Sequence, residues 1–433
     1  MERISALIFF FLLSLSLSAQ LEYVPVDTLD FANYQADTLY FDKENSLLIP
    51  FYIKFDSVVT HKTGNINIMH IGGSHVQAGT LSHRIRKNML SAYPDLIARR
   101  GMIFPYSAAN KCNNPSDYKV SRSREFSLIR NVYKDIKPLG LTGIAVYTSD
   151  SLAELKIKMN DESLSFVTDR IIVLGFSDSG YVVPQIRIDT LLYAPTEIDT
   201  LLRRYTYDIP SVIDSFSLIF PCDSAQMFTL TGILLDNQKP GITLHSIGVN
   251  GADLPAYLKC EYFVKDLELI KPDLVIFGIG INDALCKVFD TTEFKNNYLR
   301  LIDSIKVVNP ECAFIFITNN DSYKRISRGK YAVNMNGLLA RHVFYQLANI
   351  TKGAVWDQFS IMGGLKSMDK WRIEKYAKYD RIHFTIKGYN LLGDLFYNAF
   401  VKGALACWES KNETPMEKGN PETPSTKAEQ EFK

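Results

Sequence analysis

The chain has 433 residues, a formal net charge of +1 and 46% hydrophobic residues, which is the composition of an ordinary globular protein. A chain of this length can bury one large hydrophobic core and has room for a second module. Because the net charge is close to zero, no global field would attract nucleic acid or an anionic membrane, and we expect no nucleic-acid partner.

The first residues have the pattern of a secretory signal peptide. Arg3 precedes an apolar run from Ala6 to Leu13, and small residues follow it as far as Ala19. Such a run is too short to span a bilayer and is typical of a cleaved signal. We therefore expect residues 1–19 to be removed and the protein to be exported, to the periplasm or the extracellular space, without membrane insertion.

From residue 65 the sequence alternates between short apolar strands and amphipathic helices. Ile66–Ile71 is predicted to be a strand, and residues 80–90 carry apolar side chains at helical spacing. After residue 245 the alternation continues with predicted helices at Pro255–Leu269, Phe294–Lys306, Val333–Ile350 and Gly388–Val401, and with predicted strands at Asp273–Ile279 and Ala313–Thr318. Fully apolar strands between amphipathic helices predict a mostly parallel sheet with helices on both faces.

Between residues 112 and 243 the pattern changes to short strands in which polar and apolar residues alternate. The segments are Leu155–Met159, Arg170–Leu174, Gln185–Ile188, Phe216–Phe220 and Phe228–Leu235. Short strands at regular intervals predict a β-sandwich. We therefore expect one α/β domain, residues 45–111 and 244–405, interrupted by an inserted β-sandwich domain, residues 112–243. The polar segment 409–433 is predicted to be a disordered tail.

The six cysteines are widely spaced and include no CxxC pair, which argues against a zinc site or a thioredoxin-type motif. Export would permit disulfides, and a bond between Cys112 and Cys222 is conceivable if both lie in one module. The sequence alone does not assign a pairing. In a chain of this size we expect the cysteines to be small buried hydrophobic residues.

Four short segments with reactive or polar side chains follow predicted strands. They are His70–His75, Gly248–Ala252, Phe277–Asp283 and Asp380–Phe384, the last of which precedes the final predicted helix. Open α/β sheets place their ligand sites at the carboxyl ends of the strands, so we expect these four segments to meet.

The first three segments offer a nucleophile and hydrogen-bond donors. Two glycines before Ser74 let the chain turn sharply and leave the serine at the start of a helix, where its backbone N–H can help to hold an oxyanion. Taken alone, such a serine is more simply a helix N-cap. Gly251, in an Asn-Gly turn, can direct a backbone N–H inward, and Asn282 offers a neutral amide donor. An ordinary turn and loop capping are the alternatives.

The fourth segment places Asp380 three residues before His383. In a tight turn the carboxylate can accept from one imidazole nitrogen, which fixes the tautomer that takes a proton through the other nitrogen. An isolated pair of this kind is a weak signal. The occurrence of all four segments at strand ends, in this order, makes a chance pattern a poor explanation.

In this order the segments resemble the serine, glycine, asparagine and histidine blocks of the SGNH/GDSL hydrolases. The resemblance covers residues 65–110 and 243–403, and it implies an α/β fold with a flavodoxin-like SGNH hydrolase domain. It implies that Ser74 is the nucleophile, His383 the general base and Asp380 the residue that orients it. The implied oxyanion hole consists of the Ser74 N–H, the Gly251 N–H and the Asn282 side chain. Neither a cofactor nor a metal is implied.

The long β insertion between the serine and glycine blocks resembles the bacterial peptidoglycan O-acetyl esterases of this family. In those enzymes a carbohydrate-binding-module-like domain occupies that place. The resemblance implies hydrolysis of acyl esters, O-acetyl above all, on a cell-wall or other envelope polysaccharide. Two alternatives stay open: an esterase of lipids or small molecules, and a non-catalytic glycan-binding envelope protein that keeps the SGNH scaffold.

One departure from the family concerns the nucleophile loop, because this chain has Gly73 where the family has an aspartate. The triad is not affected, but support of the loop and the choice of acyl group are. His75 is expected to hydrogen-bond the loop rather than to bind a metal. Asp283 is expected either to contact substrate or to cap a helix, as is Asp253. At least half of the insertion's aromatic residues should be core, and the rest are candidates for stacking on sugars: Tyr181, Tyr193, Tyr205, Tyr207 and Phe216.

Overall fold

The computed structural model describes residues 22–412 except positions 94, 110–113, 135–137, 161–167 and 224. The expected signal peptide and Cys112, and with it the conceivable Cys112–Cys222 bond, lie outside the described residues. So does the expected tail from residue 413 onward, whereas residues 409–412 form the end of a helix.

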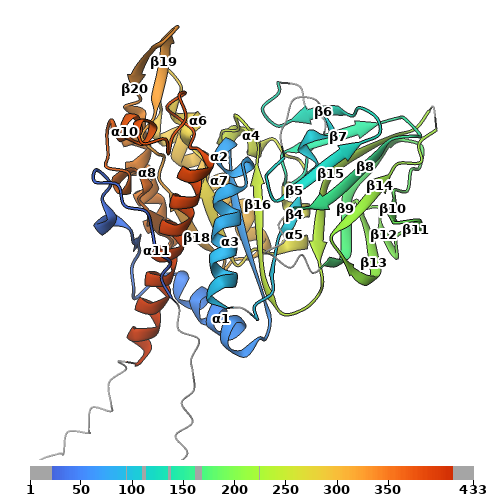
Figure 1. Ribbon diagram of the computed structural model, residues 1–433, viewed down its shortest axis with the longest axis horizontal. Coiled ribbons are helices and arrows are strands. Elements are labelled where there is room, and N and C mark those ends of the chain that lie inside the picture. The colour runs from blue at the N-terminus through green and yellow to red at the C-terminus, as the bar shows by residue number, and fades with distance from the viewer. Residues whose placement is uncertain are drawn as a thin grey trace, which may run out of the picture.

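A seven-stranded sheet forms the centre of the α/β part (Figure 1). Its strands, in spatial order, are β1 (Leu39–Tyr40), β21 (Ala354–Trp356), β18 (Ala313–Ile317), β17 (Leu274–Gly278), β2 (Asn65–Gly72), β16 (Gly241–Gly248) and β3 (Ala98–Arg99). All neighbours pair in parallel except β1, which is antiparallel to β21. Numbered along the chain, the five strands from β16 to β21 have the flavodoxin-like order 2-1-3-4-5. The predicted mostly parallel sheet is confirmed.

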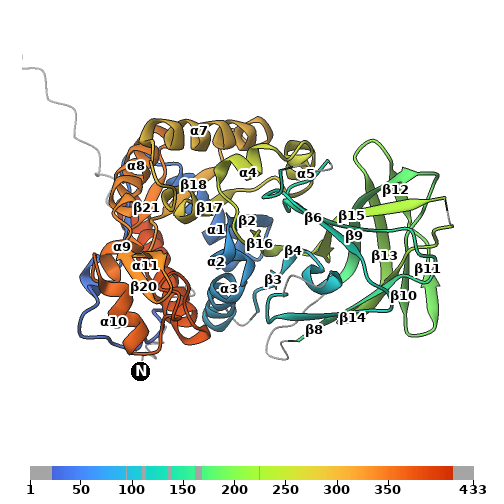
Figure 2. The ribbon, with the colours of Figure 1, turned by 90° about the horizontal axis from the view of Figure 1, so that it is seen from above.

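Helices cover both faces of this sheet (Figure 2). One face carries α1 (Leu48–His61), α3 (Thr80–Ala92) and α11 (Ile386–Asn412), and the other carries α4 (Leu254–Leu258), α5 (Phe263–Ile270), α7 (Thr291–Val308) and α8 (Asn336–Thr351). Strand β2 serves both cores, because Ile66 and Ile68 point to the first face and Met69 and Ile71 to the second. No helix in the described part of the chain is both long and apolar enough to cross a membrane.

Between β3 and β16 the chain forms two antiparallel sheets to one side of the parallel sheet (Figure 2). The first contains β11 (Leu191–Tyr193), β10 (Gln185–Ile188), β14 (Ser215–Ile219), β8 (Glu154–Met159) and β5 (Tyr118–Arg122). The second contains β12 (Glu197–Asp199), β13 (Arg204–Ile213), β9 (Thr168–Ser179), β15 (Met227–Asp236), β7 (Ile144–Thr148), β6 (Ser127–Arg130) and β4 (Gly101–Ile103). Buried side chains of both sheets belong to one core, which is continuous with the core beneath α7 and α8.

All four helices predicted after residue 245 have different bounds in the structure. Phe294–Lys306 and Gly388–Val401 are the inner parts of the longer helices α7 and α11, and the other two predictions differ more. The segment Pro255–Leu269 is two helices rather than one, because the Tyr262 N–H leaves the helical pattern and donates to the Leu139 carbonyl oxygen at 3.0 Å. The helix predicted from Val333 begins at Asn336, because the residues before it pair in an unpredicted hairpin of β19 (Tyr323–Ser327) and β20 (Lys330–Val333).

Burial bears out most expectations about single residue types. Among the five aromatic residues considered for sugar stacking, Tyr205, Tyr207 and Phe216 are buried, Tyr193 is half-buried and Tyr181 is 60% exposed. Four cysteines are buried as expected: Cys222, Cys260, Cys312 and Cys407. The expectation is wrong for Cys286, which is exposed in the loop after the short helix α6 (Ile281–Ala284).

Candidate active site

Ser74 is the first residue of the short helix α2 (Ser74–Gln77), directly beyond the carboxyl end of β2. The two strands β2 and β17 lie so close together here that a Cβ on Gly72 would be only 2.4 Å from the Gly278 carbonyl oxygen. The Oγ of half-buried Ser74 lies 2.6 Å from His383 Nε2. A serine hydroxyl and an imidazole thus meet at the edge of the sheet where open α/β folds place their sites.

Asp380 holds the other side of the His383 ring. Its Oδ2 lies 2.8 Å from His383 Nδ1, and its Oδ1 accepts the backbone N–H groups of Ile382 and His383, each at 2.9 Å. Burial opposes ionisation of this carboxyl, but the hydrogen bonds from the His383 side chain and from both backbone N–H groups outweigh it and hold the pKa of Asp380 well below its usual range. An ionised Asp380 accepts from Nδ1–H, which leaves Nε2 free to accept the Ser74 proton.

The donors expected for an oxyanion line the same cleft as Ser74 and His383. Gly251 lies in the turn after β16 with φ +84°, a left-handed conformation that favours glycine. Asn282, on α6, donates one amide hydrogen to the Ala252 carbonyl oxygen at 2.8 Å, which leaves its second hydrogen for a ligand. Within the described residues, the backbone N–H groups of Ser74 and Gly251 have no protein acceptor.

Comparison with solved structures assigns the fold. The structure of a peptidoglycan O-acetylesterase matches 85% of this chain and 99% of its own, with a TM-score of 0.68 and 19% sequence identity. The chain has the SGNH hydrolase fold. A lipase/acylhydrolase from Enterococcus faecalis (22% identity, 37% of this chain, 77% of its own, TM-score 0.29) and an acetyl xylan esterase (18%, 36%, 81%, 0.30) match a smaller part. No protein-family model and no curated protein matches the sequence.

Gly73 lies directly before Ser74, at the position where the resemblance to the SGNH/GDSL hydrolases led us to expect an aspartate. A Cβ on Gly73 would lie 3.1 Å from Asn282 Nδ2 and 3.3 Å from the Ala252 carbonyl oxygen. Both contacts are tight, so a side chain here would press on the hydrogen bond that orients the Asn282 amide. The glycine therefore leaves room for Asn282 beside the nucleophile.

The turn that carries Asp380 and His383 is held by residues that sequence reasoning missed. Arg381, with φ +58°, forms an ion pair with Asp369 at 2.7 Å and lies over the Tyr331 ring at 4.3 Å. Asn320 donates to the Ile382 carbonyl oxygen at 3.1 Å. These partners lie up to 62 positions away along the chain, so no local pattern marks them.

His75 and its neighbour His383 form a ring contact with centroids 5.1 Å apart. The Nδ1 of His75 lies 2.9 Å from the Tyr389 hydroxyl on α11, so its partner is the last helix rather than the nucleophile loop. Burial, reinforced by His383, lowers the pKa of His75 to about 3. His75 is therefore neutral and adds no positive charge beside the base. Among the described residues no group of three or more His, Cys, Asp or Glu side chains has an arrangement suited to a metal.

Asp283 and Asp253 both support the start of α4. Asp253 accepts the Ala256 N–H at 2.9 Å as N-cap, and Asp283 Oδ1 accepts the Leu254 N–H at 3.1 Å. Burial, opposed by the Leu254 hydrogen bond, raises the pKa of Asp283 to about 7. Neither residue lines the cleft, so the helix-capping alternative describes their contacts.

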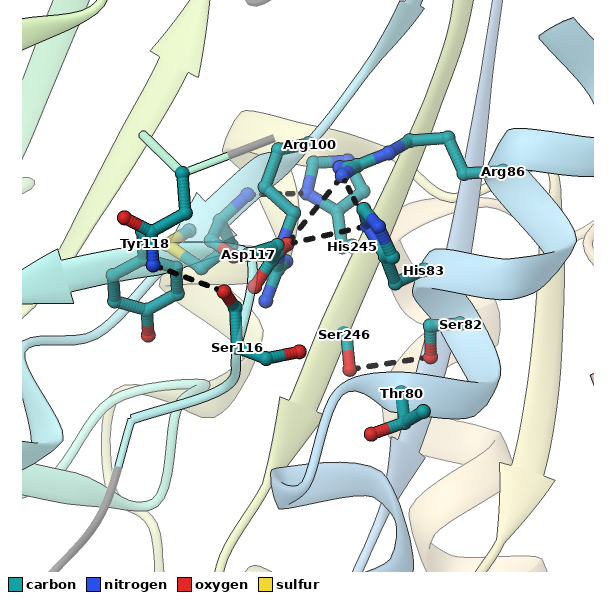
Figure 3. Close-up of polar contacts among 12 residues, drawn as sticks. Thr80, Ser82, His83, Arg86, Arg100, Ser116, Asp117, Tyr118, His245 and Ser246 are labelled. Atoms are coloured by element: carbon teal, nitrogen blue, oxygen red, sulfur yellow. Dashed lines mark hydrogen bonds and ion pairs between the residues drawn. The ribbon is translucent and has the colours of Figure 1, made fainter. Parts of the chain in front are cut away.

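The antiparallel sheets contribute directly to the cleft. Asn114 and Ser116, which precede β5, line it together with Ser74. The next residue, Asp117, is buried and anchors this segment to α3 (Figure 3): its Oδ2 lies 2.8 Å from Arg100 Nε and 3.4 Å from an Arg86 side-chain nitrogen. The residues that line the cleft are mostly polar: Ser74, Gln77, Ala78, Asn114, Ser116, Asn250, Gly251, Asn282, Lys378, His383, Ile386 and Tyr389.

Proposed function

We propose that the protein is a serine esterase that hydrolyses acyl esters, O-acetyl esters above all, on a cell-wall or other envelope polysaccharide. The observation that carries this proposal is the continuous series of contacts from Ser74 Oγ through the His383 ring to Asp380, at 2.6 and 2.8 Å, in an open cleft. Such a series activates a hydroxyl as a nucleophile and has no use in a purely glycan-binding scaffold.

In the acylation step, His383 Nε2 takes the proton of Ser74 Oγ as the oxygen attacks the ester carbonyl carbon. The carbonyl oxygen becomes an oxyanion that accepts from the Ser74 N–H, the Gly251 N–H and the Asn282 amide. Asp380 stabilises the imidazolium and keeps the ring in place. The bond to the sugar oxygen then breaks, His383 gives its proton to that oxygen, and the acyl group stays on Ser74.

Deacylation repeats these roles with water. His383 takes a proton from a water molecule, whose oxygen attacks the acyl carbon, and the same three donors hold the second oxyanion. When the bond to Ser74 Oγ breaks, His383 returns the proton to the serine. The products are a carboxylic acid and the free enzyme, and the chemistry proposed here uses only side chains and backbone of this chain.

Two observations support a glycan substrate. A matching structure that covers 85% of this chain is that of a peptidoglycan O-acetylesterase. The cleft also offers amide, hydroxyl and amine groups, such as those of Gln77, Asn250 and Lys378, which can hydrogen-bond the hydroxyl groups of a sugar. We further propose that the two antiparallel sheets are an inserted β-sandwich domain that faces the polymer, and that residues 1–19 direct export.

The test is release of acetate from O-acetylated peptidoglycan and hydrolysis of a small acetyl ester by the purified chain. Ser74→Ala should lower turnover of both by several orders of magnitude, because triad members act as a unit. The variant should keep the circular dichroism spectrum and melting temperature of the wild type. A fluorophosphonate should label the wild type at Ser74 and leave the variant unlabelled. Unchanged turnover in the variant would remove Ser74 from the mechanism.

A further inference from the structure

The catalytic cleft continues into a second hollow on the antiparallel sheets. Asn114 and Ser116 line both hollows, so they are continuous. The second hollow lies over β5 and β8, and its lining residues include Lys119, Ser121, Lys156, Lys158 and Asn160. A polymer whose ester reaches Ser74 therefore has a continuous path onto this sheet.

Three lysines crowd the exposed face of these two strands. In β8 the side chains of Leu155 and Ile157 are buried while Lys156 and Lys158 are exposed. Antiparallel pairing sets Lys119 of β5 directly opposite Lys158. Like charges at directly opposed positions destabilise a sheet, so this pairing costs stability that an anionic ligand would recover. We call Lys119, Lys156 and Lys158 the lysine groove.

The described residues do not neutralise this charge within the second hollow. No aspartate or glutamate described there lines it, and no ion pair joins any of the three lysines to a described carboxylate. The nearest acid along β8, Glu154, pairs with Arg187. Lys156 and Lys158 also line a further hollow, together with the carboxylates of Glu154, Asp189 and Asp214, whereas Lys119 lines only the hollow beside the catalytic cleft. In the cleft itself, Lys378 adds a further exposed cation.

We propose that the lysine groove binds the carboxylates of an anionic acylated glycan whose ester lies at Ser74. The inference rests on the proposed esterase function and names the class of polymer. Hydroxyl and amide groups such as Ser121 and Asn160 would suffice for a neutral glycan. Three lysines that form no ion pair with a described carboxylate favour a polymer with repeated negative charge. Lysine is a flexible point charge, which suits carboxylates spaced along a mobile chain.

The experiment compares acetylated polygalacturonate with the same polymer after methyl esterification of its carboxylates, at equal acetyl content. Replacing the groove lysines by glutamine should raise KM on the charged polymer about three- to tenfold. This is the effect expected when the binding free energy of three exposed ion pairs is lost. Turnover of the methyl-esterified polymer and of a small acetyl ester should stay within about twofold. A matched control replaces three exposed lysines outside the hollow: Lys43, Lys239 and Lys330.

Salt and binding measurements keep the two proposals separate. Raising ionic strength should lower wild-type activity on the charged polymer but not on the methyl-esterified polymer or on the small acetyl ester. Non-acetylated polygalacturonate should bind the Ser74→Ala protein and lose affinity in the glutamine variant, whether or not any ester is hydrolysed. The proposed groove would be contradicted if the wild type had equal KM values on the two polymers. It would also be contradicted if replacement of the three lysines left the affinity for non-acetylated polygalacturonate unchanged. Absence of hydrolysis with binding intact would instead contradict the esterase.

The source of the carboxylates is distinguished by a second pair of substrates. O-acetylated peptidoglycan with its stem peptides is compared with the same material after an amidase has removed them. If replacement of the groove lysines raises KM on peptidoglycan that keeps its stem peptides but not on peptidoglycan without them, the groove binds peptide carboxylates. A dependence confined to the polyuronate identifies sugar carboxylates, and both outcomes support the groove.

Discussion

The side-chain amide of Asn282 lies 3.1 Å from the point where Gly73 would carry a Cβ, so the residue before Ser74 and the asparagine that we propose for the oxyanion site share one small space. A side chain introduced at position 73 therefore acts on the Asn282 amide through this contact. The pair therefore offers a direct way to test the oxyanion role.

Asn282→Ala should lower kcat by about 10²–10³ with little change in KM, because the donor acts mainly on charge that develops in the transition state. Gly73→Asp, which introduces the aspartate expected from the resemblance to the SGNH/GDSL hydrolases, should also lower kcat, because it displaces the Asn282 amide. In the Asn282→Ala background the same glycine substitution should cost much less, since the contact is gone. Steady-state kinetics on a small acetyl ester measure all three. A pure KM effect of Asn282→Ala would place the residue in ground-state binding.

The pH profile tests His383 as base. An imidazole must be neutral to accept the Ser74 proton, so kcat/KM should fall as acid protonates the ring and should reach a plateau at neutral or alkaline pH. The pKa of Asp380 is held well below its usual range, so this carboxylate stays ionised over the whole interval. Its contribution to stability is present above about pH 4 and is lost only as pH falls further. An activity maximum well below about pH 5 would contradict the assignment.

Asp283 should make the protein's stability depend on pH in the opposite sense. Burial raises its pKa to about 7, so between about pH 4 and pH 7 the unfolded chain loses this proton before the folded one does. Stability from this group falls as pH rises through that interval. Asp283→Asn keeps an oxygen that accepts the Leu254 N–H and removes the charge. The melting temperature of the variant minus that of the wild type should be larger at pH 8 than at pH 4.5. An equal difference at both pH values would refute the buried-acid explanation.

Asp117 should be a large contributor to stability. Asp117→Asn removes the carboxylate that faces two buried guanidinium groups, Arg86 and Arg100, and should cost about 3–5 kcal/mol in the free energy of unfolding. Urea denaturation at pH 7 measures the loss. Asp150→Asn is the matched control, because its pair with Arg124 is exposed and should contribute less than about 1 kcal/mol. Similar losses in both variants would show that burial of the cluster does not matter.

Sequence patterns located the apolar strands and the four segments but not the contacts that support them. Strand β2 was predictable because its apolar residues serve two cores, and Asp380 and His383 were visible because they lie three positions apart in one turn. Asn320 was not, since its partner Ile382 is distant in sequence. The alternation of polar and apolar residues in β8 indicated a strand but not which face is buried. Lys156 faces outward because the second antiparallel sheet packs against the opposite face of β8.

The pairing of β2 with β16 joins two stretches of chain that the whole antiparallel part separates. Their eight residues match in register from Asn65 with Gly241 to Gly72 with Gly248, and Ser74 follows one strand while Gly251 follows the other. Closing so long a loop is entropically costly and slows formation of such contacts during folding. Ser74 is thus synthesised early, but Gly251, Asn282 and His383 reach it only after the intervening segment and β16 have been made. If the proposed esterase function holds, hydrolysis requires the antiparallel part and both halves of the parallel sheet to be in place.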